Sequence, residues 1–526
     1  MNEDWVETDL SEVCTYTKGK KPKLLKSVFS KETNIPYINI KAFEKGIFEH
    51  YTDGEKCNLC EDDDLLMVWD GARQGYTGKA KKGAVGSTLM KIEPVNGIEK
   101  NYLYYFLLSL YTKLNTNPRG VGIPHVEPRI LWNSKFVICN SSLQKAIVTK
   151  IESLFSDLDN GIANLKKAQV QLKIYRQAVL KKAFEGELTK EWREERITNY
   201  ELGITNEKLP TAEELLKQIK EERQKNYELR ITNWKKAVKA WEKNGKDGKK
   251  PTKPKAIKEL PSLTEDELKE LPELPDGWNW VKAGIISYIN PKIQNKSSID
   301  GELEVQFIPM KLVEEIKNII HLTEVRKFQD LQSKSYTYFE NEDILFAKVT
   351  PCMENGKIAV AKNLKNRIGY GSSEFHVFRC TSKIFNYYLF NFIVQDEFRN
   401  LSKREMSGAV GLLRVPTVFL ENYPIPIPSI PEQHQIVQEI ESRLSVCDKM
   451  EQSISESLKK ANALRQSILK KVFEGKLLSE AEIEACKQEE DYEPASVLLE
   501  KIKAEKVKTQ NIASQRKTKK SKKNGK

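Results

Sequence analysis

The sequence lacks any long apolar segment. Its longest apolar stretch, Tyr102–Tyr111, is much shorter than the ~20 residues that a helix needs to cross a bilayer. The first five residues, Met-Asn-Glu-Asp-Trp, include two acids and no apolar run, so we expect no signal peptide. Both absences favour a cytoplasmic protein.

Histidine and cysteine are also scarce. The 5 histidines fit neither a metal site nor a catalytic triad, and the 8 cysteines are scattered, which is typical of reduced thiols. Cys57 and Cys60 form the one C-x-x-C pair, but no second pair follows to complete a zinc site. The acidic run Glu61–Asp64 could hold Mg²⁺, although such a run is more typical of a solvated turn. We therefore expect no bound metal.

The common catalytic motifs are missing as well. The sequence contains no G-x-x-x-x-G-K-[ST] phosphate loop and no Asn/Asp-Pro-Pro-aromatic tetrapeptide of the kind that amino-methyltransferases use. It also has no glycine fingerprint for S-adenosylmethionine or a dinucleotide. These absences favour a binding protein over an enzyme. Three alternatives stay open: a structural coiled-coil adaptor, a methyltransferase or nuclease that carries its own recognition modules, and a module of another DNA-processing system with two recognition domains.

Positive charge is concentrated in two segments. The chain has 86 Lys+Arg against 74 Asp+Glu, a net charge of +12. Asn233–Lys258 holds ten lysines and two acids (10 − 2 = +8), and Lys508–Lys526 holds eight basic residues and no acid (+8). The remainder is 12 − 16 = −4, so any nucleic-acid surface must be built from local patches. We expect 244–261 to be a mobile linker and the segment after Lys508 to be disordered.

The chain repeats itself. Residues 178–188 read A-V-L-K-K-A-F-E-G-E-L and residues 467–477 read S-I-L-K-K-V-F-E-G-K-L, an offset of 467 − 178 = 289 residues. The same offset relates Ile147 to Ile436 and Ile151 to Ile440. A tandem duplication of this kind presents two similar surfaces at a fixed separation, which suits a ligand with two half-sites.

Each repeat begins with a globular module. Segments 1–140 and 278–430 both alternate short β-type runs with turns, and Asp64–Met67 aligns with Asp343–Phe346. A helix is expected at Asn101–Lys113. The predicted boundaries are modules at 1–142 and 278–431, long helices at 143–188 and 432–478, a helical extension with the Lys-rich linker at 189–277, and a short helix with the basic tail at 479–526.

Each module then enters a long helix. Ser141-x-x-Gln144 and Ser429-x-x-Glu432 have capping-box spacing, and Gly186 and Gly475 stand where each helix would end. Apolar residues recur at intervals of three and four, which predicts a coiled-coil seam. We expect the two helices to pair with each other in antiparallel orientation. The predicted interface consists of Ile151, Leu154, Leu158, Ile162, Leu165, Leu172, Ile440, Leu444, Ile454, Leu458, Leu464 and Ile468.

The residues at the helix junctions resemble a known family. The run Y-P-I-P-I-P-S-I-P-E-Q-H-Q-I-V-Q-E-I at 423–440 and the paired K-K-x-F-E-G-x-L endings are similar to those of specificity subunits (HsdS) of type I restriction-modification enzymes. The first copy of the junction, 136–148, lacks the proline ladder but keeps Gln144. The resemblance implies an α+β fold with two homologous target-recognition domains, which carry mixed and antiparallel sheets and are separated by the helical pair.

The resemblance also implies a division of labour. The chain would be a non-catalytic DNA-binding subunit in which each module reads one half of a bipartite, asymmetric double-stranded sequence. The helical pair would set the spacer and dock two modification (methyltransferase) subunits, and restriction/translocase subunits would join them. S-adenosylmethionine, ATP and Mg²⁺ would be bound by those partners and not by this chain.

Candidate DNA contacts follow from the side chains that suit base edges and phosphates. The richest stretches are 70–82 in the first module and 348–357 in the second, because they combine flexible backbone with basic and amide side chains. The predicted DNA-binding residues are Arg73, Gln74, Tyr76, Lys79, Lys81, Lys82, Arg119, His125, Arg129, Lys348, Asn355, Lys357, Ser372, Ser373, Lys403, Arg404 and Arg414.

Overall fold

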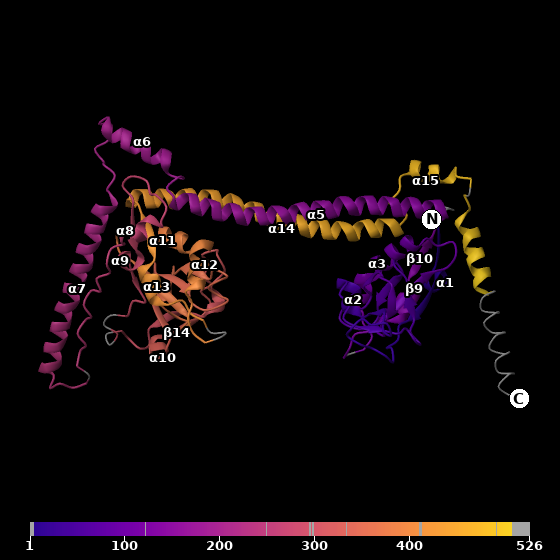
Figure 1. The fold of residues 1–526 in the computed structure, drawn as a ribbon, viewed down its shortest axis with the longest axis horizontal. Coiled ribbons are helices and arrows are strands. Elements are labelled where there is room, and N and C mark those ends of the chain that lie inside the picture. The colour runs from indigo at the N-terminus through magenta and orange to yellow at the C-terminus, as the bar shows by residue number, and fades with distance from the viewer. Residues whose placement is uncertain are drawn as a thin grey trace. The chain divides into compact units, whose positions relative to one another are not determined.

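A computed structural model describes residues 5–507 apart from 121, 249, 294–295, 297–298, 333, 410–412 and 491. The chain forms two compact units, one of Met1–Lys167 with Ile454–Lys526 and one of Ala168–Ser453. Each unit therefore contains one module and parts of both long helices (Figure 1). Among the described helices, none is long and apolar enough to cross a membrane.

The first module combines two four-stranded sheets with a two-stranded ribbon. One sheet has the order β2-β9-β6-β7 and is antiparallel, and the other has the order β4-β3-β8-β5 with β3 and β8 parallel. The ribbon pairs β1 with β10. In chain order the elements are β1 (Val6–Asp9), α1 (Leu10–Val13), β2 (Cys14–Lys18), β3 (Ile35–Ile38), α2 (Ile40–Lys45), β4 (Tyr51–Thr52), β5 (Leu59–Cys60), β6 (Leu65–Val68), β7 (Thr77–Lys79), β8 (Gly83–Val85), β9 (Leu89–Pro94), α3 (Lys100–Thr116), α4 (Pro128–Trp132) and β10 (Lys135–Ile138).

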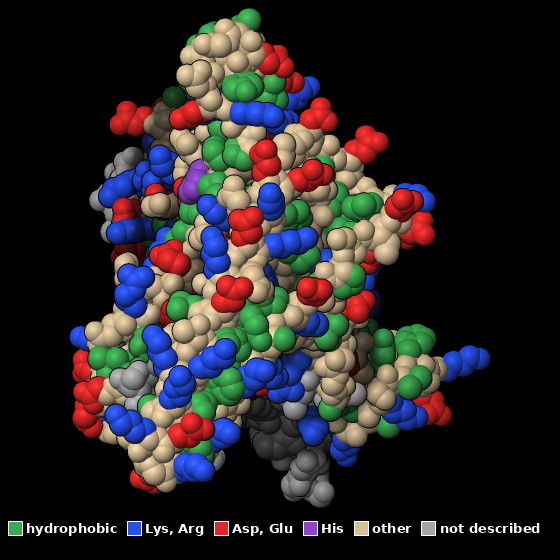
Figure 2. All heavy atoms as spheres, turned by 90° about the vertical axis from the view of Figure 1, so that its left-hand side faces the viewer, with side chains coloured by type: hydrophobic (Ala, Val, Ile, Leu, Met, Phe, Trp, Pro, Cys, Tyr) green, Lys and Arg blue, Asp and Glu red, His purple; other side chains and the backbone are tan. Residues whose placement is uncertain are grey.

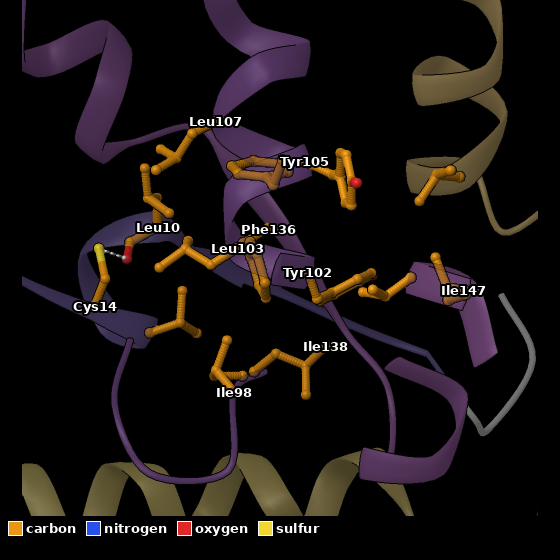
Figure 3. Close-up of a cluster of buried hydrophobic side chains, with 14 of the residues drawn as sticks. Leu10, Cys14, Ile98, Tyr102, Leu103, Tyr105, Leu107, Phe136, Ile138 and Ile147 are labelled. Atoms are coloured by element: carbon orange, nitrogen blue, oxygen red, sulfur yellow. Dashed lines mark hydrogen bonds between the residues drawn. The ribbon is translucent and has the colours of Figure 1, made fainter. Parts of the chain in front are cut away.

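The core of this module lies between α3 and the strands (Figure 3). Tyr102 and Phe136 are fully buried, and the Tyr102 hydroxyl donates to the carbonyl of Val137 at 3.0 Å. That bond satisfies the one polar atom of a large, otherwise apolar side chain. An unpaired hydroxyl in the core would destabilise the folded module. Cys14 donates to the carbonyl of Leu10 at 3.3 Å, and burial raises the pKa of its thiol to about 12. Cys14 is therefore a packing residue.

The second module repeats this topology. Its sheets have the orders β12-β19-β16-β17 and β14-β13-β18-β15, again with one parallel pair (β13 and β18), and β11 pairs with β20. The expected duplication is confirmed. The elements are β11 (Asn279–Lys282), α9 (Ala283–Ile286), β12 (Ser287–Ile289), β13 (Glu304–Ile308), η2 (Met310–Leu312), β14 (Val325–Lys327), α10 (Phe328–Gln332), β15 (Thr337–Glu340), β16 (Ile344–Ala347), β17 (Ile358–Val360), η3 (Lys365–Arg367), β18 (Ile368–Gly371), β19 (Phe375–Cys380), α11 (Asn386–Ile393), α12 (Asp396–Arg404), α13 (Thr417–Asn422) and β20 (Pro424–Ile427).

The long helices are α5 (Ser141–Phe184) and α14 (Ile430–Phe473), and they run antiparallel within each unit. In the first unit Arg465 of α14 pairs with Asp159 of α5. In the second unit Arg176 of α5 pairs with Asp448 of α14. The expected antiparallel helical pair is confirmed.

The end of each long helix packs on the module of the other repeat. Phe184, the last residue of α5, lies with its ring 5.1 Å from Tyr388 of the second module. Phe473, the last residue of α14, lies 5.5 Å from Tyr102 of the first module. Phe184 and Phe473 are the phenylalanines of the repeated K-K-x-F-E-G endings. The most similar part of the two repeats therefore lies at the junction between helix and module.

Most of the predicted helix interface is at least partly buried. Ile151, Ile440 and Ile468 are buried, and all the others except Leu464 are half-buried. Leu464 does not fit, because its side chain is 50% exposed. Arg465 takes the inward position instead, with its guanidinium 4.6 Å from the Phe155 ring centre.

The helix starts differ from the predicted capping boxes. Asn140, not Ser141, caps α5, because its Oδ1 accepts from the amide of Leu143 at 2.9 Å. Ser429 accepts from the amide of Glu432, but the Glu432 carboxylate turns away to bind Arg193. The predicted helix ends are confirmed, since Gly186 and Gly475 both follow the last turn with positive φ.

Short helices after each long helix dock on the modules in matching ways. They are α6 (Lys190–Glu201), α7 (Ala212–Lys243) and α8 (Glu265–Lys269) after α5, and α15 (Glu480–Lys487) and residues 495–507 after α14. Arg223 of α7 donates to the carbonyls of Gly284 and Ile285, and Lys506 donates to the carbonyl of Ser11. The predicted basic tail after Lys508 lies outside the described residues.

Candidate nucleic-acid interface

Three segments meet at one end of the antiparallel sheet in the first module. The loop 69–76 leaves β6 after Val68, and Val68 pairs with Leu89, the first residue of β9. The amide of Trp69 donates to the carbonyl of Thr88 at 2.8 Å, and the amide of Gly71 donates to the carbonyl of Pro124 at 2.8 Å. The β6–β7 loop, the β8–β9 connection and the segment around the Arg119–His125 bridge therefore form one surface, which we call the first loop cluster.

Asp70 organises the charged side chains of the first loop cluster. One of its carboxylate oxygens lies 2.6 Å from His125 Nδ1 and the other lies 3.2 Å from Lys18 Nζ. The guanidinium of Arg73 stacks 4.2 Å from the Tyr76 ring centre and pairs with Glu44 at 3.1 Å. Stacking holds a planar, multiple donor in a defined orientation while about half of its side chain stays exposed, which suits recognition of a base edge.

The second module builds the same surface from equivalent segments. The amide of Lys348 donates to the carbonyl of Glu374, and the amide of Val415 donates to the carbonyl of Lys348, both at 2.9 Å. The loop 348–357, the β18–β19 connection and the segment at Arg414, which bridges to Val349, thus form a second loop cluster. Because Ala347 pairs with Phe375, this cluster also lies at the end of β16.

Arg414 is held by Glu374 in this second loop cluster. Its Nε and NH2 groups donate to the two carboxylate oxygens at 2.8 and 2.9 Å. The two hydrogen bonds from Arg414 hold the pKa of Glu374 below its usual range. Burial lowers the pKa of Lys348, which stands behind the pair. The fork geometry fixes the plane of an exposed guanidinium before any ligand arrives.

A buried histidine supports the second loop cluster from below. His376 Nε2 donates to the carbonyl of Val415 at 2.8 Å, and Nδ1 accepts from the Asn290 amide at 2.9 Å. Burial lowers the pKa of His376 to about 4, so its ring is neutral at physiological pH. A neutral ring with one donor and one acceptor matches both partners.

The structure brings several predicted residues together and uses others internally. Gln74 is only 2% exposed, and its Nε2 donates to the carbonyl of Asn115, so it positions the loop and cannot read a base from there. Asn355 donates to Glu315 and Lys357 donates to the carbonyl of Val313. The residues exposed or half-exposed at the two loop clusters are Arg73, Tyr76, Arg119, His125, Lys348, Ser372, Ser373 and Arg414, with Arg129 on α4 and Lys403 and Arg404 on α12 nearby in the chain.

The predicted stretch 70–82 divides between two ends of the sheet. Lys79 pairs with Leu65 at the opposite end of β6 from the loop 69–76. Beyond it, Lys82 pairs with Glu61 at 2.9 Å, and Lys81 lies beside it in the chain. A strand carries successive residues away from a loop at about 3.3 Å per residue, so closeness in sequence does not keep these lysines with Arg73. Lys79, Lys81 and Lys82 therefore do not belong to the first loop cluster.

Sequence reasoning missed the β8–β9 connection. Ser87 and Thr88 occupy the place that Ser373 and Glu374 take in the second module, between the parallel-paired strand and the next one. A sequence signal was present, because Gly86-Ser87-Thr88 is similar to Gly371-Ser372-Ser373, although the structural register is shifted by one residue. Lys18, Asp70 and Glu374 were also missed, since only tertiary contacts show that they hold cluster side chains in place.

No metal centre is found in the described part of the chain, where no cluster of His, Cys, Asp and Glu could hold an ion. Cys60 is buried and donates to the carbonyl of Gly83 at 3.4 Å, and Asp64 pairs with Lys91 at 2.8 Å. These side chains are used in packing and ion pairing within the module.

Comparison with known proteins places the two modules in one family. The model for the type I restriction modification DNA specificity domain matches residues 2–169 and 275–460, which together exceed half of the chain. The chain belongs to this family. Both matched ranges begin four residues before the ribbon strand of a module (6 − 2 = 4 and 279 − 275 = 4) and end inside a long helix, so each describes one copy of the duplicated unit.

Individual relatives of the family agree. The chain is 36% identical over 267 residues to the specificity subunit of the type I restriction enzyme EcoAI from Escherichia coli, a match that spans 44% of each chain. It is 24% identical over 516 residues to the EcoBI specificity subunit of Escherichia coli, covering 96% of this chain and 93% of that one. The chain thus spans less than half of the length of the EcoAI relative that it matches.

A solved structure described as the structural basis of complex assembly and conformational transition of the type I R-M system contains a similar chain. It gives a TM-score of 0.57 at 16% identity and covers 90% of this chain and 98% of that one. At this identity the likeness concerns the fold alone. It agrees with two family modules joined to a pair of long helices.

Proposed function

We propose that this chain is the DNA sequence-recognition subunit of a type I restriction-modification complex, and that each loop cluster reads one half of a bipartite, asymmetric target. The observation that carries the proposal is the recurrence of the loop cluster. Two homologous modules place the same three segments at the same end of the same sheet, yet fill them with different side chains. That is expected of one scaffold reading two unlike sequences.

The side chains of the loop clusters suit direct reading of bases. Arg73 and Arg414 are oriented by stacking and by a bidentate acid respectively, and each can present two parallel donors to a guanine edge. The hydroxyls of Ser87, Ser372 and Ser373 can donate or accept at either a base or a phosphate. An arginine already held in a plane loses less side-chain entropy on binding than a free one.

The partners follow from the family and the missing catalytic motifs. The helices α5 and α14 would fix the gap between the half-sites and dock methyltransferase subunits, two of them in our proposal, and restriction/translocase subunits would complete the complex. S-adenosylmethionine, ATP and Mg²⁺ would be bound in those partner subunits. The chain itself would supply recognition and no chemistry.

Sequencing of methylated DNA tests the proposal. Cells carrying this chain with its methyltransferase partner should show one bipartite methylated motif. Arg414→Ala should relax one position in one half of that motif and cost about 1–3 kcal/mol in binding, because a bidentate base contact is lost. Arg414→Lys should behave similarly, since lysine keeps the charge but not the fork.

The matched control is Lys82→Ala, at the opposite end of the first module's sheet from its loop cluster. It should leave the motif unchanged. If Arg414→Ala altered bases in both halves, or weakened all sequences equally, its assignment to one half-site would be wrong. If no bipartite motif were methylated at all, the proposed function would be wrong.

A further inference from the structure

The second half of α7 and the segment that follows it form a hairpin arm, defined here as residues 224–260. The indole of Trp234 donates to the carbonyl of Pro251 at 2.9 Å, and the indole of Trp241 donates to the carbonyl of Gly248 at 3.1 Å. The ammonium groups of Lys253 and Lys250 lie 6.0 and 5.9 Å from the same two rings. The segment 244–261, expected to be a mobile linker, thus includes residues that contact α7.

Two apolar patterns match across the hairpin arm. On α7 half-buried residues recur at intervals of three and four, and in the returning segment they recur every third residue, which is the repeat of a polyproline II helix. Packing of these two rows covers the apolar face of α7 with the chain's own residues. The rows are Tyr227, Ile231, Trp234, Val238 and Trp241 on α7, and Pro251, Pro254, Ile257 and Leu260 in the returning segment.

The base of the hairpin arm is fixed to the second module. Arg223 donates to the carbonyls of Gly284 and Ile285 at 2.9 and 2.8 Å, and its guanidinium lies 4.6 Å from the Tyr288 ring centre. On the returning side Lys258 pairs with Glu421 of α13. The arm thus starts and ends on the module that carries the second loop cluster.

In the second half of α7 the face opposite the apolar row is mainly basic. At about 100° per residue, Lys225, Lys236, Lys239 and Lys243 fall on the side away from the tryptophans. All four are exposed, and the described ion pairs include none of them. Residues 224–260 of the chain include twelve basic residues and four acids, 12 − 4 = +8. Figure 2 views this side of the molecule and shows Lys and Arg in its lower part, among some Asp, Glu and hydrophobic side chains.

Such a face is unusual for a helix that only meets water. Solvated helix faces usually mix both signs, because like charges at i,i+3 and i,i+4 repel each other and destabilise the helix. The lysines on this face of the hairpin arm repel one another in this way. Residues 170–274, which include the arm, lie between the two ranges that match the family model.

The sequence attaches a second basic segment at the equivalent place. Leu215 and Ile219 of α7 are buried, and so are Leu498 and Ile502 after α14, at a common offset of 498 − 215 = 283 residues. In each repeat a lysine-rich stretch with a net charge of +8 comes after these buried residues, at 233–258, which begins within α7, and at 508–526. Because a basic segment follows each module, we infer that both segments contact a ligand that the two modules share.

We propose that the hairpin arm is a sequence-independent contact to the phosphate backbone of duplex DNA, next to the half-site read by the second module. The proposal rests on the proposed function for the identity of the polyanion. DNA is favoured over an acidic protein because lysine is depleted in protein interfaces and the apolar face, which would anchor such an interface, is already covered. Lysine on a flexible stem suits phosphates as a point charge, without reading sequence.

Salt dependence of DNA binding tests the hairpin arm directly. The assembled complex of this chain with its methyltransferase subunits is titrated with a random-sequence duplex at several salt concentrations. In Lys236→Gln/Lys239→Gln/Lys243→Gln, the slope of log K against log salt should fall by about 0.9 for each lost phosphate contact, up to about 3 in total. The methylated motif should not change, because none of these lysines reads a base.

A matched triple variant supplies the control. Lys208, Lys217 and Lys220 are also exposed, carry the same total charge, and lie before the hairpin arm. Changing them to Gln should leave the slope unchanged. An unaltered slope in the arm variant, or an equal fall in the control, would overturn the proposal, and so would loss of complex assembly on size-exclusion chromatography, which would assign the arm to a protein partner.

These outcomes are separate from those that test the proposed function. A random duplex needs no knowledge of the motif, and the motif is measured by sequencing methylated DNA. A complex that methylates one bipartite motif but shows no change in salt slope would keep the proposed function and reject the role of the hairpin arm. Equal thermal unfolding of the two triple variants establishes that the comparison is between folded proteins.

Discussion

Arg176 of α5 forms an ion pair with Asp448 of α14. The repeat offset of 289 residues relates this pair to a second one. Arg176 corresponds to residue 176 + 289 = 465 and Asp448 to residue 448 − 289 = 159, and Arg465 pairs with Asp159. The same two repeat positions therefore meet twice, with the helices exchanging roles. An antiparallel pair of duplicated helices produces this arrangement, and a parallel pair would place like positions side by side.

The first prediction concerns the charge pairs of the helices. Arg176→Glu should lower the free energy of unfolding by about 0.5–1 kcal/mol, because it replaces an attraction to Asp448 and Glu451 with a repulsion at a partly exposed site. Adding Asp448→Arg should restore part of the loss. Chemical denaturation of the four proteins of this double-mutant cycle measures the coupling. A coupling near zero would show that the pair does not help to hold the helices in register.

A second prediction concerns Glu432 at the start of α14. Its buried carboxylate accepts from Arg193 at 2.6 Å, from Thr189 at 2.9 Å and from the Trp278 indole at 2.9 Å. Glu432→Ala leaves these donors without their acceptor and should cost about 3–5 kcal/mol, as is typical when one partner of a buried pair is removed. Denaturant unfolding measures the loss.

Glu439→Ala is the control for this prediction. Glu439 lies on the same helix and pairs with Arg443 one turn away in a more exposed setting. Its removal should cost less than about 0.5 kcal/mol. Equal losses from the two variants would contradict the view that burial of the Glu432 carboxylate sets the cost.

A third prediction concerns pH. Burial lowers the pKa of His376 from 6.5 to about 4, so between these pH values the unfolded chain binds a proton that the folded chain does not. The stability contributed by the neutral ring is therefore fully present above about pH 6.5 and is lost as the pH falls toward 4, by on the order of 3 kcal/mol in total. Below pH 4 this loss should level off.

The measurement compares the wild type with His376→Gln across that range. Carboxylates also titrate there, so the difference between the two unfolding curves isolates the imidazole. Glu374 and Lys348 both face the ring and are present in both proteins. Parallel curves for the two proteins between pH 6.5 and pH 4 would show that His376 does not carry the effect.

A fourth prediction concerns the spacer. Seven residues inserted after Lys167 in α5 and seven after Glu456 in α14 add one heptad to each partner and keep the seam in phase. At ~1.5 Å per residue the pair lengthens by about 10 Å, so the unspecified gap in the methylated motif should grow by about three base pairs. Sequencing of methylated DNA gives the result. Changed bases with an unchanged gap would contradict the spacer role of the helices.

Much of the fold could be predicted because the duplication makes the same sequence pattern occur twice. The K-K-x-F-E-G endings, the glycines after them and the three-and-four spacing locate both long helices within a few residues. The N-cap residue of α5 was harder to predict, because Asn140 and Ser141 are both good N-cap residues. Which of them caps the helix depends on the partners that Gln144 finds in the folded module.

The DNA-facing residues were harder still. Arg73, Gln74 and Lys82 belong to one promising run of sequence, yet one stands in the loop cluster, one is buried under it and one lies at the far end of the strand. The linker posed the opposite problem. Lysine content suggested a free chain, whereas the period-three row of Pro251, Pro254 and Ile257 becomes meaningful only against the tryptophans of α7.

The sequence by itself determined that two copies of one unit exist, that each ends in a long amphipathic helix, and that common catalytic motifs are absent, because these properties are carried by local pattern and by repetition. Only the tertiary structure decided that the helices run antiparallel, that Phe184 and Phe473 each pack on the module of the other repeat, and which loops share a surface. Those outcomes depend on contacts between residues far apart in the chain, whose pairing is chosen by the burial of apolar surface over the whole molecule.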